Sequence, residues 1–312
     1  MNPYLVVNPT SGGGRTGKTF PEMRKAIERA LGTCDVGETK RAGHAVELAQ
    51  AAAEKGHELV VAVGGDGTFS DVVDGVLRAK GTGAKSSGAE VALIGQGTGG
   101  DFRKTLELEH RLDGYLEAIT SGKKRGLDVG RFRYQTRAGE TRDRHFVNIL
   151  SCGLGGLVDQ YVAGASRMLG GTAAYFGASV RGLLAVQKGR LRCELSLAGK
   201  AETHVLHTYV LAICNGRFFG AGMHVAPMAD PTDGVFEVIA LESTSKLAFA
   251  LASGRIYSAK HMATATHLRC DKIRVTLENE DAGPFLLDVD GEPLGALPVD
   301  VELVRSAVTL RG

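Results

Sequence analysis

The 312-residue sequence contains no hydrophobic run that approaches the roughly 20 residues needed for a membrane-spanning helix. Its first nine residues, MNPYLVVNP, lack the basic region and the long apolar stretch of a signal peptide. The 5 cysteines lie far apart and never form a CxxC pair, which argues against a disulfide framework and a zinc knuckle. We therefore expect a cytoplasmic protein with reduced thiols.

A strong excess of one charge is also absent. The 37 Lys and Arg residues against 35 Asp and Glu residues leave a net charge of +2, so no overall basic field would recruit nucleic acid. Proline is not enriched, with 8 residues, and the 43 glycines show no G-X-Y period. Collagen-like and low-complexity chains are thereby excluded. So many glycines, about twice the average usage of roughly 7%, indicate tight turns and close backbone approaches.

The composition, 43% hydrophobic and 23% charged, is that of a globular protein, and the length leaves room for two domains. Strands predicted at 4–7, 34–38, 58–63 and 91–94 alternate with helices at 20–31, at 43–55 and after residue 68. The continuous apolar run 58–63 is typical of a strand buried on both faces. Such alternation predicts a parallel sheet with ligand loops at the carboxyl ends of its strands.

The pattern changes after residue 134. Strand-like runs follow at 145–151, 192–197, 207–214, 235–241, 272–277, 285–289 and 299–304, with helical stretches near 171–187 and 245–253. We expect a mainly antiparallel β-sandwich here. The boundary falls near the polar stretch 131–144, which gives domains 1–134 and 135–312, with the final segment free to pack back on the first domain.

Two of the buried strands run directly into glycine-rich turns that contain an acid and a threonine, GGDGT at 64–68 and GQGTGGD at 95–101. Free N–H groups of such a turn at a helix N-terminus form an anion site. One GGDG would more simply be a tight turn, but two after consecutive strands favour nucleotide phosphates. Neither a Walker A loop nor a GxGxxG fingerprint is present.

These turns belong to an ordered set of motifs: NPTSG at 8–12, GGDGT at 64–68, GTGGDF at 97–102, LDVG at 127–130, FVN at 146–148, NGRFFGAGM at 215–223, APMADPTDG at 226–234 and DGE at 290–292. Together they resemble the diacylglycerol kinase catalytic family, which includes bacterial lipid kinases and sphingosine and ceramide kinases. GGDGT alone is shared with NAD kinases and phosphofructokinases, and the later motifs select the lipid branch. The resemblance covers nearly the whole chain.

The resemblance implies a nucleotide-binding domain of the phosphofructokinase and NAD kinase type, followed by a β-sandwich, with ATP and a lipid meeting between them. It implies an ATP- and Mg²⁺-dependent kinase that phosphorylates a hydroxyl of diacylglycerol or a related lipid. The implied nucleotide-binding residues are Asn8, Thr39, Gly64, Gly65, Asp66, Gly67, Thr68, Gly97, Thr98 and Asp101. The implied magnesium residues are Asp230, Asp233, Val235 and Asp128.

The proton acceptor matched by the resemblance is Glu292. From the residues alone, Glu292 would be an acid in a hairpin turn, because Asp290-Gly291 is a strong hairpin signal. Phosphoryl transfer to an alcohol needs charge neutralisation and an acceptor for the hydroxyl proton, and Asp66 is the second candidate for that acceptor. For Asp128, a structural hydrogen bond to a loop and a place in the metal network have equal weight.

The sequence departs from the family pattern at two positions. The family usually has GGDGTxNE, and here Ser70 and Asp71 occupy the last two places; it usually has GTxND, and Gly100 replaces the asparagine. Both changes remove an amide near the nucleotide and leave the nucleotide preference open. A soluble-metabolite kinase of the NAD kinase type ranks second, and a non-catalytic nucleotide or lipid sensor third.

Membrane contact has a weaker signal. The segment 171–192 has an apolar face followed by basic residues, namely Arg181, Lys188, Arg190 and Arg192, and could lie on an anionic membrane. A core helix with a solvated basic end explains the segment as well and is the more common case for a single helix. The expected partners are a lipid substrate and the inner membrane surface, and the sequence is compatible with a homodimer.

Overall fold

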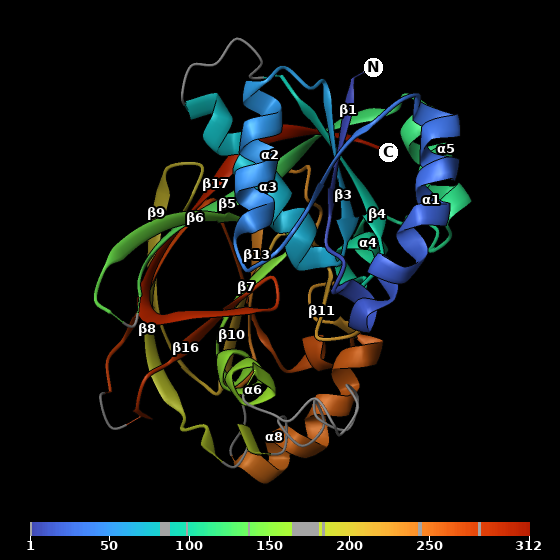
Figure 1. Cartoon of the computed structure of the whole chain (residues 1–312). Helices are drawn as coiled ribbons and strands as arrows, with labels where there is room; N and C mark the ends of the chain where they lie inside the picture. The colour runs from blue at the N-terminus through green and yellow to red at the C-terminus, as the bar shows by residue number, and fades with distance from the viewer. Residues whose placement is uncertain are drawn as a thin grey trace.

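The computed structural model describes residues 2–81, 88–97, 99–136, 138–163, 181–182, 185–242, 245–279 and 282–312 (Figure 1). The first half contains β1 (Pro3–Val7), η1 (Ser11–Gly14), α1 (Arg15–Leu31), β2 (Asp35–Glu38), α2 (His44–Glu54), β3 (Leu59–Gly64), α3 (Asp66–Gly81), β4 (Glu90–Gly95), α4 (Asp101–Thr105) and α5 (Leu112–Thr120). The second half contains β5 (Lys124–Gln135), β6 (Thr141–Phe146), β7 (Ile149–Gly153), α6 (Leu154–Ala163), β8 (Gly189–Leu197), β9 (Lys200–Thr208), β10 (Val210–Cys214), β11 (Phe218–Phe219), β12 (Met223–His224), β13 (Phe236–Ala240), α8 (Lys246–Ser253), η3 (Gly254–Ser258), η4 (Lys260–Ala263), β14 (Thr266–Cys270), β15 (Lys272–Leu277), β16 (Leu286–Val289) and β17 (Glu292–Arg311).

The first half is a parallel sheet in the order β4-β3-β1-β2 with helices on both faces (Figure 1). Successive side chains of a strand point to opposite faces, so Leu5 and Val7 pack with α1 and α5, whereas Val6 packs with α2 and α3. Both sets are fully buried, which explains the continuous apolar runs. The predicted α/β class is confirmed.

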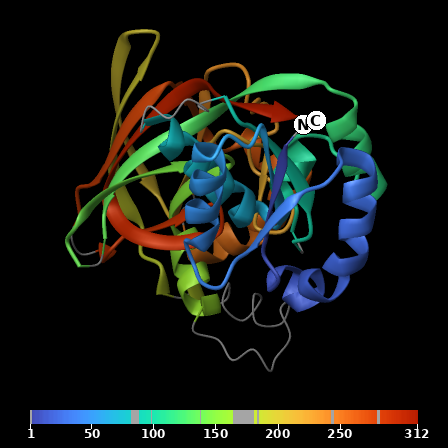
Figure 2. The same ribbon diagram turned by 45° about the horizontal axis from the view of Figure 1, so that its top comes forward.

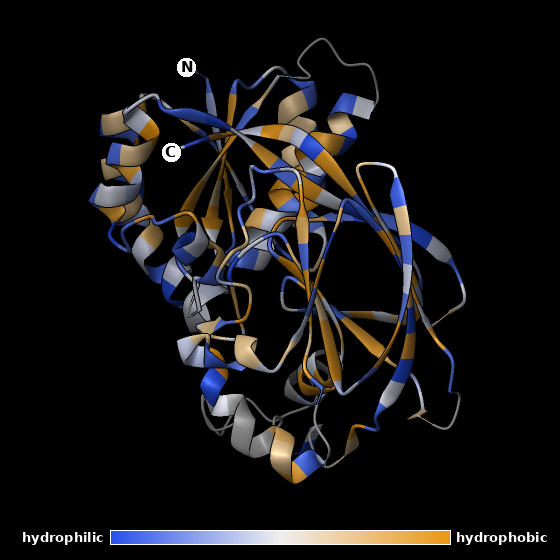
Figure 3. Ribbon diagram, turned by 180° about the vertical axis from the view of Figure 1, so that it is seen from behind, coloured by the Kyte–Doolittle hydropathy of each residue, from blue (hydrophilic) through white to orange (hydrophobic). Residues whose placement is uncertain are grey.

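The second half is the predicted antiparallel sandwich. Its strands follow the order β14-β13-β10-β7-β16-β17, and β5, β6, β8, β9 and β15 extend the sheet from β17 and from one another. The core between the layers contains Phe132, Phe146 and Phe236, all almost completely buried. Hydrophobic residues concentrate on the strands inside both halves (Figure 3).

Some predicted elements differ in extent. The polar stretch 131–144 is part of the antiparallel hairpin β5–β6, where Arg131 and Arg133 are exposed while Phe132 and Tyr134 are buried. Its charge density therefore reflects a strand with one face in solvent. The run predicted at 145–151 is divided between β6 and β7, and the run at 207–214 between β9 and β10. The helix predicted near 171–187 lies largely outside the described residues.

Strand β17 joins the two halves. It pairs with β16, β15 and β5 in the sandwich and ends parallel to β4, where Leu310 faces Val91. The described strands thus include one continuous 15-stranded sheet, and both ends of the chain lie at the same end of the parallel strands (Figure 1 and Figure 2). None of the helices in the described ranges has the length and apolar character that crossing a membrane requires.

Candidate active site

The carboxyl ends of the parallel strands bring the predicted nucleotide residues to one edge of the sheet. Asn8 follows β1, Thr39 follows β2 and Gly65 follows β3. The Asn8 side-chain amide donates a hydrogen bond to Thr68 Oγ1 at 3.1 Å, and the Thr39 N–H donates to Val7 O at 2.8 Å. Thr98, predicted for the same site, lies outside the described residues.

The glycines of this edge let three loops meet backbone to backbone. A Cβ on Gly97 would lie 2.8 Å from Gly65 Cα, so a larger residue at 97 would force the loops apart. Gly12 has φ +60°, and a Cβ there would lie 2.7 Å from Gln96 O. Gly65 has space for a Cβ, 3.5 Å from Gly97 Cα. Since α3 begins directly after Gly65, its free N–H groups open into this junction and suit an anion.

The turn between β16 and β17 contacts the start of α3 from the other half of the molecule. The Asp290 carboxylate accepts the backbone N–H groups of Val147, Asn148 and Ile149 at 2.9, 3.1 and 2.9 Å, and the Ser70 hydroxyl. Its burial raises its pKa above the ordinary value. These bonds interrupt the strand predicted at 145–151, and the bond from Ser70 ties α3 to the sandwich. The sequence indicated only a hairpin acid at Asp290.

Glu292 follows that turn and is held by Arg144. Arg144 Nη1 donates to Glu292 Oε2 and Nη2 donates to Asp71 Oδ1, each at 3.0 Å. The Glu292 side chain is 38% exposed, whereas that of Asp71 is 10% exposed. Burial and then the nearby Glu292 charge raise the pKa of Asp71 to about 7. The sequence analysis did not single out Arg144, because this residue belongs to none of the motifs. It named Asp71 only as a departure from the family pattern and gave it no role.

Asp66 is the other candidate proton acceptor and begins α3. Its Oδ2 accepts the Asp101 N–H at 2.7 Å. Burial raises its pKa to about 6, and the neighbouring Asp101 and Asp290 charges add to that rise. A Cβ on Gly67 would lie 3.7 Å from Asp290 O. Asp66 and Glu292 therefore lie on opposite sides of one contact between the halves. Arg144 holds Glu292 at the surface.

Asp101 connects the nucleotide edge to the NGRFFGAGM segment. Its Oδ1 pairs with Lys104 Nζ at 2.8 Å, and its Oδ2 accepts the Ala221 N–H at 2.8 Å. Both oxygens are thus used within the protein, and the side chain is buried. Asp101 organises the loops at this edge, and its N–H holds Asp66.

Three of the predicted magnesium residues, Asp230, Asp233 and Val235, lie in the loop before β13, and the fourth, Asp128 of β5, is hydrogen-bonded to that loop. Asp128 is 1% exposed, and its carboxylate accepts the N–H groups of Gly234 and Ser306 at 2.7 and 2.6 Å. Asp233 Oδ1 accepts the Val235 N–H at 2.9 Å, and burial raises the pKa of Asp233. Asp128 therefore makes the structural hydrogen bond to a loop that was one of its two interpretations. Asp230 turns the same loop by accepting the Thr232 N–H at 3.0 Å.

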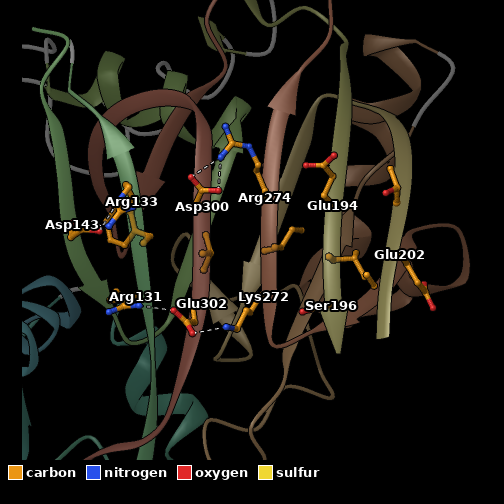
Figure 4. A pocket seen from close by; sticks show the side chains of 16 residues that line it. Arg131, Arg133, Asp143, Glu194, Ser196, Glu202, Lys272, Arg274, Asp300 and Glu302 are labelled. Atoms are coloured by element: carbon orange, nitrogen blue, oxygen red, sulfur yellow. Dashed lines mark hydrogen bonds and ion pairs between the residues drawn. The ribbon is translucent and has the colours of Figure 1, made fainter. Parts of the chain in front are cut away.

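Two hollows in the described part of the chain lie elsewhere. One, of about 540 Å³, covers the outer face of β5, β17, β15, β8 and β9 (Figure 4). Its charges pair along the sheet: Glu302 with Arg131 and Lys272 at 2.6 and 2.8 Å, and Arg274 with Asp300 at 2.8 Å. The other, of about 780 Å³, lies by His57 and Arg311 at the opposite end of the parallel strands. Neither lining contains a predicted site residue.

Comparison with known proteins concerns the family and the two halves of the chain. Residues 2–132 match the family model of the diacylglycerol kinase catalytic domain, and residues 148–311 match that of the YegS C-terminal NAD kinase beta sandwich-like domain. A diacylglycerol kinase of Staphylococcus aureus (strain bovine RF122 / ET3-1) is 26% identical over 242 residues, which cover 77% of this chain and 70% of the relative. One from Staphylococcus haemolyticus is 27% identical over 149 residues, 48% of this chain and 41% of the relative.

Solved structures show the same fold. The crystal structure of a diacylglycerol kinase from Bacillus anthracis strain Sterne is similar to this chain with a TM-score of 0.70 at 19% identity, covering 99% of this chain and 96% of that one. A second solved structure, also of a diacylglycerol kinase from that strain, gives a TM-score of 0.75 at 21% identity, with the same coverage. At such identities the likeness establishes the architecture.

Proposed function

This chain belongs to the diacylglycerol kinase catalytic family, and from that premise we propose that it transfers the γ-phosphoryl group of ATP to a hydroxyl of diacylglycerol or a related lipid. The observation that carries the proposal is the contact between the halves. The N-terminal turn of α3 in one half, which follows the glycine loops, lies against the turn that precedes the half-exposed carboxylate Glu292 in the other, since a Cβ on Gly67 would lie 3.7 Å from Asp290 O. A phosphate donor and a proton acceptor are what kinase chemistry needs side by side.

Backbone N–H groups would bind the phosphates of the nucleotide. Polyphosphate carries charge on many oxygens, and N–H groups at a helix N-terminus can approach it where no Cβ intervenes. The junction of Gly12, Gly65 and Gly97 provides such an approach. Asn8 is hydrogen-bonded through its carbonyl to Ser11, the neighbour of Gly12, and its side chain orients Thr68, while Thr39 follows the adjacent strand β2. We therefore assign the phosphates of ATP to this junction.

A magnesium ion would be coordinated jointly by those phosphates and by carboxylates of the protein. Mg²⁺ usually keeps several waters and is bound through one or two carboxylates together with substrate phosphates. In the described ranges, no three His, Cys, Asp or Glu side chains converge in a way that would hold an ion by themselves. Asp66 is the carboxylate beside the junction, and the loop of Asp230, Asp233 and Val235 is the second place implied by the family. When bound, the ion would neutralise phosphate charge.

We assign acceptance of the lipid hydroxyl proton to Glu292. As the lipid oxygen forms its bond to the γ-phosphorus, the bond from that phosphorus to the β,γ-bridging oxygen breaks, and Glu292 accepts the hydroxyl proton. Arg144 keeps one Glu292 oxygen fixed at 3.0 Å. Asp71 holds the other arm of Arg144, so the guanidinium stays in place through the step. Because phosphoryl transfer needs little covalent help from the protein, this positioning is the main contribution expected of these residues.

The two departures from the family pattern leave the backbone intact. Gly100 has φ +56° at the N-cap of α4, a conformation that glycine and asparagine adopt more readily than other residues. Replacing asparagine by glycine there removes an amide and keeps the turn. Ser70, in the place of the other asparagine, donates to Asp290. Both substitutions therefore keep the local arrangement that the kinase proposal requires.

The test is incubation with labelled ATP, Mg²⁺ and a panel of diacylglycerol, sphingosine, ceramide and NAD, followed by mass analysis of the product. We expect a phosphorylated lipid. Phosphorylated NAD would support the soluble-metabolite alternative, and tight ATP binding without any product would support the sensor. A lipid substrate places the reaction at the cytoplasmic face of a membrane, where this protein would make peripheral contact.

A further inference from the structure

Two large hydrophobic side chains are strongly exposed on consecutive elements. Leu247 in α8 is 70% exposed and Tyr257 in η3 is 56% exposed. Apart from these two, the only exposed large hydrophobic residues in the described ranges are Val205 and Met228, each 40% exposed. Single exposed apolar residues are common on protein surfaces. Two on neighbouring elements that contact each other need an explanation.

The same region is basic. Residues 243–270 contain no Asp or Glu, and their four Lys and Arg residues include Arg255 and Lys260, both exposed. Arg255 donates to the Lys260 carbonyl at 3.4 Å. Among the residues that the structure describes, no carboxylate pairs with either side chain, so both charges face solvent. Leu247, Arg255, Tyr257 and Lys260 are called the α8–η3 surface below.

The basic residues that the sequence suggested for membrane contact differ from this surface. Arg190 pairs with Glu278 at 2.9 Å, and Arg192 pairs with Glu194 at 3.1 Å. Arg181 lies over the Tyr161 ring at 4.5 Å. Internal acids thus neutralise much of the charge around β8, whereas the α8–η3 surface keeps its charge.

The α8–η3 surface lies on the side of the candidate active site. Ile256 of η3 packs into the cluster that contains Met223 and Val225, next to β12. The strand β11, paired with β12, contacts α4, which begins at Asp101. Figure 1 shows α8 at the lower end of the molecule, toward which the carboxyl ends of β1, β3 and β4 point.

We propose that the α8–η3 surface docks the protein on an anionic lipid bilayer. Leu247 and Tyr257 enter the headgroup region, and Arg255 and Lys260 contact lipid phosphates. Tyrosine favours the membrane–water interface, apolar side chains flanked by basic ones suit an interfacial helix, and each basic residue near an anionic surface adds to the attraction. The assignment rests on the proposed function, because a lipid substrate is what gives the bilayer contact its purpose.

The binding test needs no catalysis. The full chain is sedimented with vesicles of phosphatidylcholine alone and of phosphatidylcholine with phosphatidylglycerol in equal parts. We expect binding to the anionic vesicles that falls with salt. The variants Leu247→Ser/Tyr257→Ser and Arg255→Glu/Lys260→Glu should each weaken it at least about tenfold. The control Val205→Ser removes an exposed hydrophobic residue on β9 and should bind like the wild type.

A second measurement separates docking from chemistry. The docking variants should lose turnover on vesicles and keep it on a short-chain, water-soluble diacylglycerol. Vesicle binding that depends on the α8–η3 surface without any lipid product would support the surface and overturn the proposed function. The surface assignment is overturned if the wild type binds neither vesicle, or if its variants bind normally while Arg190→Glu/Arg192→Glu abolishes binding. It is also overturned if Leu247→Ser/Tyr257→Ser only converts a dimer to a monomer in sedimentation velocity.

Discussion

At the scale of single residues, Asp290 and Glu292 show how two neighbouring acids receive different tasks. Asp290 is partly buried and accepts three backbone N–H groups of its own half, and the Ser70 hydroxyl of α3 joins it to the other half. Glu292 is half exposed and touches one arginine. Because a general base must reach its substrate's proton, only the second arrangement suits proton transfer.

Replacing Glu292 tests that division of tasks. Glu292→Gln keeps the shape and removes the basicity, so turnover on diacylglycerol should fall by about 10²–10⁴-fold. The affinity for ATP should barely change, because the junction of glycines is untouched. Glu302→Gln is a matched control, since Glu302 lies on the same strand with 36% exposure and pairs with Arg131 and Lys272. Near-normal turnover of Glu292→Gln at saturating lipid would transfer the role of base to Asp66.

Asp71 predicts a pH dependence of stability. Its pKa of about 7 in the folded protein lies above its ordinary value, so the folded state holds a proton that the unfolded state releases. The free energy of unfolding therefore falls as pH rises through the window up to about 7, and the full cost is present above it. Asp71→Asn removes this cost.

Urea unfolding followed by circular dichroism would measure the effect. The gain of Asp71→Asn over the wild type should be larger at about pH 8 than at about pH 4 by at least ~1 kcal/mol, the equivalent of roughly one pKa unit. Asp143→Asn is the control, because Asp143 is 53% exposed and pairs only with Arg133 among the described residues. A gain that is the same at both pH values would contradict the assignment.

At the scale of elements, the start of α3 combines two demands. Its first turn must expose N–H groups to a phosphate, and Ser70, Asp71 and Asp74 on the same helix bond to residues of the second half. Gly65 matters for phosphate binding and not for the contact between the halves, since a Cβ at this position would make only ordinary van der Waals contacts. Substitution at this glycine therefore separates ligand binding from folding.

Gly65→Val should weaken ATP binding by an order of magnitude or more, because a branched side chain would occupy the approach to the helix N-terminus. The thermal midpoint should change little. Isothermal titration with ATP and Mg²⁺ measures the first quantity, and calorimetry measures the second. Gly81→Val, at the other end of α3 where a Cβ meets nothing within 4 Å, is the control. Normal ATP binding by a folded Gly65→Val variant would remove the phosphates from this junction.

At the scale of the whole molecule, β17 makes the halves interdependent. It begins at the candidate base, runs through the sandwich and ends in the core of the first half. A substitution near the C-terminal end of β17 should therefore destabilise both halves. Leu310 is 1% exposed in that core.

Leu310→Ala should reduce the free energy of unfolding by about 2–5 kcal/mol. Hydrogen exchange should increase in both β4 and β5, because both strands pair with this end of β17. Leu247→Ala, at a 70% exposed position, should stay within about 0.5 kcal/mol of the wild type. Faster exchange confined to β4 would show that the halves unfold separately.

Much of this protein follows from the sequence alone. Apolar runs and turn chemistry depend on neighbours along the chain, so the parallel strands, the glycine turns and most sandwich strands were predictable. The same local signals place Asn8, Thr39 and Gly65 at one edge, because parallel strands end together. Glu292 was found only through its motif, since a hairpin acid has no local mark of catalysis.

Tertiary structure decided the rest, because those features depend on residues far apart in the chain. Arg144 joins Glu292 and Asp71 across separations of 148 and 73 residues, and no local pattern encodes such a bridge. The polar stretch 131–144 has one face in solvent because β5 pairs with β6, and that pairing joins residues that are apart in the chain. Asp128 became a structural brace once Gly234 and Ser306 met it. Packing also decides whether a basic side chain has an acidic partner. The arginines of β8 have such partners among the described residues, and the basic residues of the α8–η3 surface have none there.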